Sequence, residues 1–199
     1  MAMAELDHLR TLVKLGREER FLEYKESGPW DNLKEKIAKT AIGMANIRDG
    51  GTIILGVSQR GGRFEAQGLS EEHVASYDGD RLQDYIHEFA DPYVRSEFHT
   101  FDVDNKQFLA IVIHEFDEVP VICRRDSAGT VRGRVYTRSH RKPETCEVPS
   151  QTEMRDIIEL ATDKAIARFI QRLQRAGLIE PVKMGPFDAE RFGKQREGL

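Results

Sequence analysis

The sequence has few cysteines and no long apolar run. Only Cys123 and Cys146 occur among 199 residues, without a C-x-x-C motif or Cys/His pairs at zinc spacing, so neither a disulfide framework nor a structural zinc is predicted. No apolar stretch approaches the roughly 20 residues of a membrane-spanning helix, and the start MAMAELDHLR lacks the basic-then-apolar plan of a signal peptide. We therefore expect reduced thiols, a cytoplasmic location and no membrane partner.

A Walker A motif is also missing, although glycine is frequent. That motif needs Gly-Lys followed by Ser or Thr, whereas the Gly-Lys pair of this chain, Gly193-Lys194, precedes Gln195. The six histidines are scattered, and no Ser/His/Asp or Cys/His set can be identified by spacing. ATP is therefore not expected as a cofactor, and a nucleophilic hydrolase is not favoured.

Charge is distributed unevenly along the chain. The net charge is −4, yet residues 124–142 carry seven basic side chains against a single acid, Asp126. The basic residues alternate with Val131, Val135 and Tyr136, a pattern typical of an ordered strand with one basic face. The set comprises Arg124, Arg125, Arg132, Arg134, Arg138, Arg141 and Lys142. A solvated charged surface would explain this cluster, and so would a binding site for a polyanion.

Apolar residues recur at spacings of three and four in several segments, which is typical of amphipathic helices. Asp31 is a candidate N-cap for the second of these segments. Ser150 and Glu153 form an S-x-x-E capping box at the start of the last one, and Gly177 is expected to end it. The predicted helices are residues 5–16, 32–46, 78–90 and 151–177.

Two nearly all-apolar runs, TIILGV at residues 52–57 and FLAIVI at residues 108–113, predict strands that are buried on both faces. Residues 98–103 and the turn DVDNKQ predict that the second run belongs to a hairpin. Strands and helices do not alternate regularly, so the expected fold class is α+β. We expect a mostly antiparallel or mixed sheet with both runs at its centre, covered by helices 32–46 and 78–90.

These segments suggest four parts. The expected parts are an N-terminal helix at 1–16, a main domain at 17–150, a C-terminal amphipathic helix at 151–177 and a flexible tail at 178–199, which is rich in proline, glycine and charge.

The stretch REERFLEYKESG, residues 17–28, places two glutamates five positions apart. Glu18 and Glu23 would lie about 140° apart on a helix and on opposite faces of a strand, so neither regular element brings them together. A helix that ends near Arg20 and continues as an extended segment to Lys25 could do so, with Glu23 and Lys25 on one face. Alternatively, Glu19 and Glu23 could be the solvated side of a single helix.

Five short segments follow one another in the order and at the intervals of a known domain. They are Glu18-x4-Glu23-Tyr24-Lys25, Ala45-Asn46, Gly50-Gly51-Thr-Ile-Ile-Leu-Gly56-Val57, Gly68-Leu69 and Val135-Tyr136-Thr137-Arg138-Ser139. Together they resemble the Schlafen AlbA-like (AlbA_2) family, whose plan is E-x4-E-F-K, A-N-x-x-G-G-x-x-x-x-G-V, a G-L step and Y-x-R-x-G. The resemblance runs from about residue 17 to 150 and implies a nucleic-acid-binding domain.

The resemblance also implies a possible catalytic site. In the nuclease branch of the family, the glutamates of E-x4-E and a later aspartate bind a divalent metal and cleave RNA, so Glu18 and Glu23 are candidate ligands of Mg²⁺ or Mn²⁺. Lys25 would stand beside them and face a phosphate. The family places its third acid directly after G-V, whereas this sequence has Ser58-Gln59 there.

Three functions are therefore open. The first is a nucleic-acid-binding protein, with RNA favoured over DNA, in which the seven basic residues contact phosphates and Tyr136 stacks on a base. The second is a metal-dependent endoribonuclease, a toxin or antiviral defence effector that uses Glu18, Glu23 and Lys25. The third is a non-enzymatic subunit of a protein assembly that docks through the C-terminal helix.

The resemblance has a consequence for assembly. Schlafen proteins pair two AlbA-like halves around a basic cleft, whereas this sequence contains one such half. We therefore expect a homodimer or a complex with a partner protein, in which two copies of the 132–142 segment line one groove.

Overall fold

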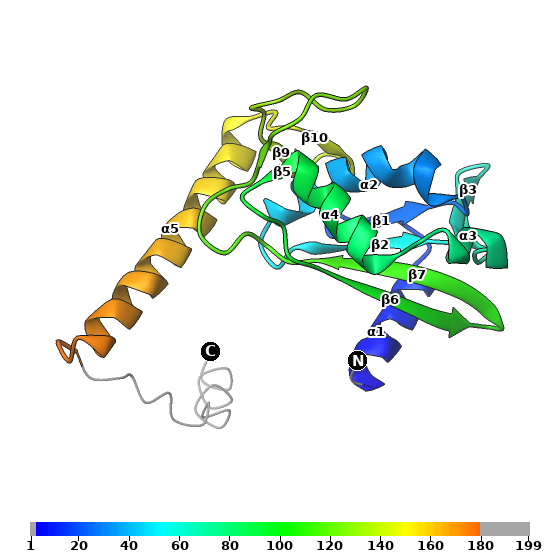
Figure 1. The fold of residues 1–199 in the computed structure, drawn as a ribbon, viewed down its shortest axis with the longest axis horizontal. Helices are drawn as coiled ribbons and strands as arrows, with labels where there is room; N and C mark the ends of the chain where they lie inside the picture. Colours follow the sequence, from blue (N-terminus) through cyan, green and yellow to red (C-terminus); the bar gives the residue numbers. More distant parts are fainter. Residues whose placement is uncertain (1–2, 180–199) are drawn as a thin grey trace, which may run out of the picture. The chain divides into compact units, whose positions relative to one another are not determined.

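The computed structural model describes residues 3–179 and divides the chain into two compact units, Met1–Thr162 and Asp163–Leu199. Residues 180–199, most of the predicted tail, lie outside the described part (Figure 1). The helices are α1 (Met3–Lys14), α2 (Trp30–Ala45), α3 (Glu71–Ala75), α4 (Gly79–Phe89) and α5 (Gln151–Arg175). The strands are β1 (Leu22–Lys25), β2 (Gly51–Leu55), β3 (Val57–Arg60), β4 (Arg63–Ala66), β5 (Ala90–Asp91), β6 (Ser96–Val103), β7 (Lys106–Ile113), β8 (Ile122–Cys123), β9 (Tyr136–Arg138) and β10 (Thr145–Glu147).

The main sheet has four strands in the order β1-β2-β7-β6. β1 runs parallel to β2, whereas β2 with β7 and β7 with β6 are antiparallel, so the sheet is mixed. Three two-stranded pairs, β3-β4, β5-β8 and β9-β10, surround it. The predicted α+β class and the central positions of the two apolar runs are confirmed.

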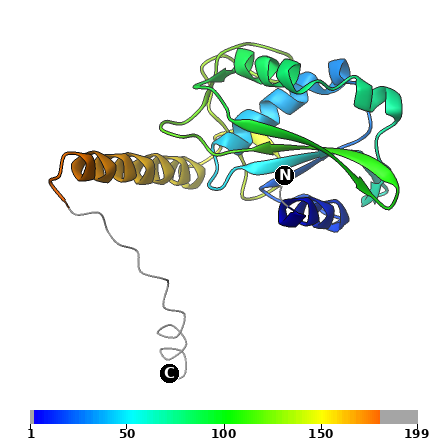
Figure 2. The same cartoon turned by 60° about the horizontal axis from the view of Figure 1, so that its bottom comes forward.

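Strand alternation divides the apolar side chains between two cores. On β2, Ile53 and Leu55 join the core beneath α2 and α4, whereas Ile54 joins a second core with α1. On β7, Leu109 and Ile111 belong to the first core. Figure 2 shows α2 and α4 on one side of the sheet and α1 on the other. Both central strands are therefore buried on both faces, as their composition predicts.

The start of α2 differs from the prediction. The helix begins at Trp30 after Pro29, and Asp31 lies in its first turn instead of capping it. The hydroxyl Oγ of Ser76 accepts the backbone N–H of Trp30 at 3.0 Å, so the end of α3 satisfies a donor that the helix cannot. Asp31 instead accepts a hydrogen bond from Lys34 at 2.8 Å.

The turns at the hairpin and at both ends of α5 follow the sequence signals. Asp104 and Asn105, with φ of 50° and 61°, form the tight turn between β6 and β7. Ser150 begins α5 as predicted, because its hydroxyl accepts the Thr152 N–H at 3.2 Å. It donates to the Glu153 carboxylate itself, however, so the two residues are joined side chain to side chain and do not form the reciprocal backbone bonds of a capping box. Gly177, at φ 69°, follows α5.

The basic segment 124–142 is not the continuous strand that its alternating pattern predicts. Within it, only Tyr136–Arg138 forms a strand, β9, and the rest is loop. β9 is short because it pairs with β10 over only three residues. The loop before it is held by two other hydrogen bonds, from the Val131 N–H to the Tyr136 hydroxyl and from the Arg132 N–H to the Asp126 carboxylate. Across residues 3–179, no helix is long and apolar enough to cross a membrane, and Cys123 and Cys146 are free thiols.

Asn46, at the end of α2, joins three segments through its buried amide. Its Nδ2 donates to the carbonyls of Val121 and Tyr136, each at 2.8 Å, and its Oδ1 accepts the N–H of Val121 at 2.8 Å. The residue is 1% exposed, so no water can replace these partners. Asn46 therefore holds β9 and the segment before β8 against α2.

We predict that Asn46→Ala lowers the free energy of unfolding by about 3 kcal/mol, because three hydrogen bonds are lost and buried backbone groups are left unpaired. Urea unfolding followed by circular dichroism measures the change. Asn32→Ala, at an exposed position of the same helix, is the control and should change stability by less than about 0.5 kcal/mol. Equal effects of the two substitutions would contradict the role given to Asn46.

Candidate nucleic-acid interface

A tight turn brings the two glutamates together. α1 ends at Lys14, close to the predicted end at residue 16, so no helix extends to Arg20. Glu19 and Leu22 then exchange two backbone hydrogen bonds of 3.0 and 3.1 Å. The chain reverses there and enters β1, so the Glu18 carboxylate reaches the backbone N–H of Tyr24 at 3.0 Å. The alternative of a single helix through Glu19 and Glu23 is wrong, because Glu23 lies on a strand.

The four residues of β1 alternate between the faces of the sheet. Leu22 and Tyr24 are buried in the core with α1, and Glu23 and Lys25 share the opposite face, where their side chains form an ion pair. Because β1 is an edge strand, Glu18 also occupies part of its free edge by accepting the Tyr24 N–H.

Arg138 is the second partner of Glu23 and is completely buried. Its NH1 donates to the Glu23 carboxylate at 2.6 Å, and its other nitrogens donate to backbone carbonyls. The accepting carbonyls belong to Glu19, Arg20, Leu22 and Pro143, at 2.7 to 3.3 Å. The guanidinium therefore joins the turn before β1 to β9 and to the loop between β9 and β10.

Two neighbouring pockets lie along the exposed side of α2. One, of about 230 Å³, is lined by Glu18, Glu23, Lys25, Lys36, Lys39, Thr40, Pro143, Glu144 and Thr145. The other, of about 410 Å³, is lined by Asp31, Asn32, Glu35, Lys36, Lys39, Ala128 and Gly129. Lys36 and Lys39 line both pockets, so a single ridge of α2 separates them. We call the two pockets and this ridge the α2 surface.

Two lysines of the α2 surface, Lys36 and Lys39, are available for binding, whereas Lys25 is paired with Glu23. Lys36 is exposed and has neither a hydrogen bond nor an ion pair within the described residues. The ammonium of Lys39 lies 5.4 Å from the centre of the Tyr136 ring, a cation–π contact that holds its position without neutralising it. Sequence reasoning missed both residues, because lysines on the polar side of an amphipathic helix are commonplace.

The carboxyl of Glu18 has a raised pKa. Burial is the main cause, and the nearby Glu23 carboxylate raises the pKa further, while the Tyr24 N–H, Lys25 and Arg138 act in the opposite direction. Glu18 thus holds its proton to a higher pH than an exposed glutamate does.

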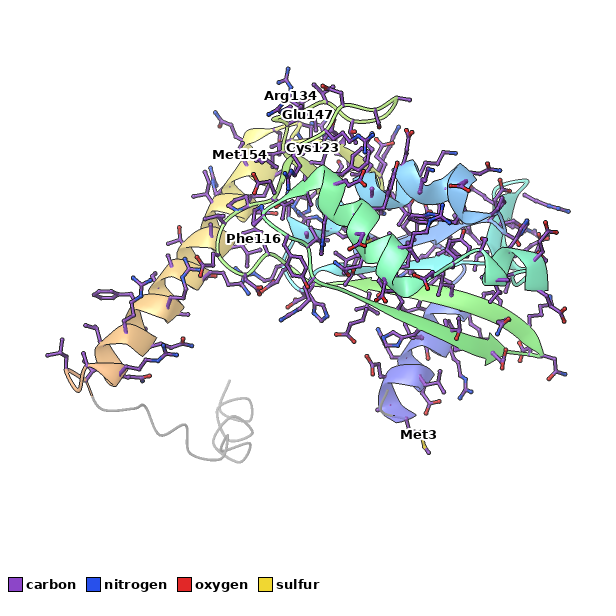
Figure 3. All side chains as sticks on the ribbon, in the orientation of Figure 1. Met3, Phe116, Cys123, Arg134, Glu147 and Met154 are labelled. Carbon is purple, nitrogen blue, oxygen red and sulfur yellow. The ribbon has the colours of Figure 1, made fainter. Side chains whose placement is uncertain are left out.

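The structure separates the predicted basic residues into three groups. Arg124, Arg132, Arg141 and Lys142 are exposed, and their side chains have no hydrogen bond or ion pair within residues 3–179. Arg125 pairs with Glu88, and Arg134 pairs with Glu147 at 2.8 Å on the exposed surface beside β10 (Figure 3).

Arg138 forms the third group, and here the prediction needs correction. Its guanidinium is 0% exposed and is surrounded by protein acceptors, so it cannot contact a phosphate. Tyr136 is 4% exposed, and its hydroxyl accepts the Val131 N–H at 2.9 Å, so its ring cannot stack on a base. Both residues stabilise the fold beneath the α2 surface.

A metal ion finds a poor fit at Glu18 and Glu23. Lys25 and Arg138 already contact the two oxygens of Glu23, and the third family acid has no counterpart, since Ser58 is a buried residue of β3 and Gln59 is exposed. Within residues 3–179, the only three His, Cys, Asp or Glu side chains close enough to share an ion lie elsewhere, at Glu5, Glu97 and His99.

We predict that Arg138→Met lowers the free energy of unfolding by about 3 to 5 kcal/mol, because the Glu23 carboxylate and four carbonyls lose their partner in a buried site. Arg138→Lys should retain only part of the lost free energy of unfolding, because an ammonium lacks the planar set of five donors. Chemical denaturation of the full chain gives both values.

Arg134→Met is the matched control, since Arg134 lies only four residues before Arg138 but forms an exposed ion pair, with Glu147. It should change stability by less than about 1 kcal/mol. If Arg138→Met were as mild as this control, the buried network would not stabilise the fold.

Comparison with known proteins agrees with the motif order. The family described as Schlafen, AlbA_2 matches residues 18–147. The comparison with curated proteins gives no significant match.

Two solved structures are similar to this chain, and the first of them shares its fold. The DIP2311 protein from Corynebacterium diphtheriae is 19% identical, with a TM-score of 0.52 over 77% of this chain, which spans only 28% of that protein. The N-terminal domain of a RecG-related protein from Nitrosomonas europaea is 22% identical, with a TM-score of 0.44, over 76% of this chain and 97% of that domain. Because the family match covers well over half of the sequence, this chain belongs to the Schlafen AlbA_2 family.

Proposed function

We propose that this protein binds nucleic acid, with RNA favoured over DNA, through phosphate contacts on the α2 surface and its flanking loops. The observation that carries the proposal is the position of Lys36 and Lys39 between two pockets, with Lys25 in one of them. Phosphate groups are recognised by such cations without any need for a catalytic group.

The loops that border the pockets supply further cations. Ala128 and Gly129 line one pocket and precede Arg132, and Pro143 to Thr145 line the other and follow Arg141 and Lys142. Because these three basic side chains are exposed and lack ion pairs within the described residues, they keep their full charge for a ligand.

Acidic residues in the pockets limit where a phosphate can bind. Glu23 is already compensated by Lys25 and Arg138, and a carboxylate oxygen of Glu18 already accepts the Tyr24 N–H. Glu35 and Glu144 also line the pockets; both are exposed, and neither forms an ion pair within residues 3–179. We therefore place the phosphates over Lys36, Lys39 and the loop cations, away from the floor of the pocket.

We predict that Lys36→Glu combined with Lys142→Glu weakens RNA binding roughly tenfold or more, because each reversal removes a phosphate contact and adds a repulsion. The slope of log affinity against log salt should also fall by about one unit for each lost contact. Fluorescence anisotropy with a labelled transfer RNA and with duplex DNA of similar length measures affinity, slope and preference.

The matched control is Arg60→Glu combined with Arg63→Glu, which makes the same change in net charge on the β3-β4 hairpin, outside both pockets. Its binding should stay within about twofold of the unmodified protein. Equal losses in the two double variants would mean that net charge alone governs binding, and the α2 surface would then not be the site.

The alternative proposal is metal-dependent RNA cleavage at Glu18 and Glu23. The pocket that these two glutamates share supports it, and the contacts of Glu23 with Lys25 and Arg138, which a metal would have to displace, count against it. It is distinguished by incubating the same RNA with Mn²⁺ or Mg²⁺. Cleavage that disappears in Glu18→Gln, while binding persists, would support it. If the RNA stays intact under conditions in which all of it is bound, the cleavage proposal is contradicted and only the binding function remains.

We also propose that the protein works as a homodimer or with a partner protein. The supporting observation is the exposure of large apolar side chains on α5, among them Ile158, Ile166 and Phe169 at 52 to 59%. Light scattering of the full chain should give twice the monomer mass, and Phe169→Asp should shift the mass towards the monomer. A monomer that binds RNA with unchanged affinity would contradict the dimer and leave the α2 surface intact.

A further inference from the structure

Three potential metal ligands meet between α1 and the sheet. Glu97 and His99 are two residues apart on β6 and so share one face of that strand, and Glu5 lies in the first turn of α1. α1 covers this face of the sheet (Figure 2), and Met3 marks its free end (Figure 3). One ligand atom from each of the three side chains lies within 4.8 Å of the other two.

The His99 ring nitrogen Nε2 is the centre of this cluster. It lies 3.5 Å from a Glu97 oxygen and 3.9 Å from a Glu5 oxygen, and it is buried without a hydrogen-bond partner. A buried polar nitrogen without a partner is unusual, because burial removes its hydrogen bonds to water and nothing replaces them. A cation held between Nε2 and the two carboxylates would supply that missing partner.

His114 fixes the orientation of Glu97. It follows β7, and its Nε2 lies 2.7 Å from the Oε1 of Glu97, which leaves Oε2 facing His99. Outer side chains that hydrogen-bond a metal-binding carboxylate are how many proteins orient that ligand, and His114 holds Glu97 in this way.

We propose that Glu5, Glu97 and His99 bind one divalent transition-metal ion, with Zn²⁺ as the best match. An imidazole nitrogen and two carboxylates suit zinc, whereas magnesium and calcium prefer oxygen alone. Ligands at zinc bond lengths in tetrahedral geometry lie about 3.4 Å apart, and the two spacings from His99 Nε2, 3.5 and 3.9 Å, are close to that value. Three protein ligands leave the fourth position to water.

The proposed site is independent of the α2 surface. Glu97 and His99 are on β6, at the opposite edge of the sheet from β1. They share a strand face with Phe101 and Val103, which belong to the core with α1. A bound ion would join the start of α1 to β6, while the apolar contacts of Leu9, Leu12 and Val13 hold the rest of that helix. Short zinc spacings in a sequence cannot reveal such a site, because Glu5 and Glu97 are far apart along the chain.

Zinc binding to the full chain tests the proposal, with a chromophoric chelator as competitor. We expect one ion per chain and a rise in the unfolding temperature on adding zinc, because the ion binds the folded state preferentially. Replacement by Co²⁺ should give the visible absorption of a four-coordinate site with nitrogen and oxygen ligands.

Variants separate this site from chance binding. His99→Gln and Glu5→Gln should each weaken zinc binding at least tenfold, and His114→Gln should weaken it about tenfold by releasing Glu97. Glu5 is half exposed near the start of α1, so its variant remains informative even if His99→Gln fails to fold.

His140→Gln is the matched control. His140 also lies beside a carboxylate, that of Asp156 at 2.6 Å, but within residues 3–179 it belongs to no group of three possible ligands. Its zinc affinity and cobalt spectrum should be unchanged. Zinc affinity in Glu5→Gln equal to that of the unmodified protein, or an equal loss in His140→Gln, would mean surface-bound zinc only and would overturn the proposal.

Discussion

The rest of the domain depends on the hydrogen bonds and the ion pair of the buried Arg138 guanidinium. A charge with no exposure to solvent is stable only if protein groups replace its hydration, and here one carboxylate and four carbonyls do so. Those acceptors come from the turn before β1, from β1 itself and from the loop after β9. The network therefore fixes the path of the chain at both ends of the smaller pocket.

This dependence changes how the family motif is interpreted. Glu23 matches a catalytic position of the nuclease branch, yet in this chain it is the counter-ion of Arg138 and of Lys25. Glu18 similarly accepts the free N–H of an edge strand. Both glutamates have a structural reason to be present, so the motif alone does not establish catalysis. The proposed binding function rests instead on the nearby cations, above all Lys36 and Lys39, which can contact phosphates without a metal ion.

Sequence predicted the sheet well because its central strands are apolar on both faces, a pattern that only a doubly covered strand satisfies. It failed at Arg138 and Tyr136, since alternation shows that two residues share a face but not whether that face is exposed. It also missed Lys36 and Lys39, whose importance comes from loops some hundred residues later that border the same helix. The turn at Glu19 could not be predicted for a different reason. The strand that follows it has four residues, which are too few to show the alternation of a strand in the sequence.

The edge strand β1 connects the two sides of the sheet. Leu22 and Tyr24 pack against α1, and the Tyr24 hydroxyl donates to the carbonyl of Leu12 in that helix. Glu23 and Lys25, between and after them, face the α2 surface. A displacement of α1 would therefore shift Leu22 and Tyr24 of β1. Because Glu23 and Lys25 belong to the same strand, the shift would also change the smaller pocket, which these two residues line. Because Glu5 and the proposed zinc ligands lie at the other end of α1, an ion there would steady the helix that backs the pocket strand, without touching the pocket itself.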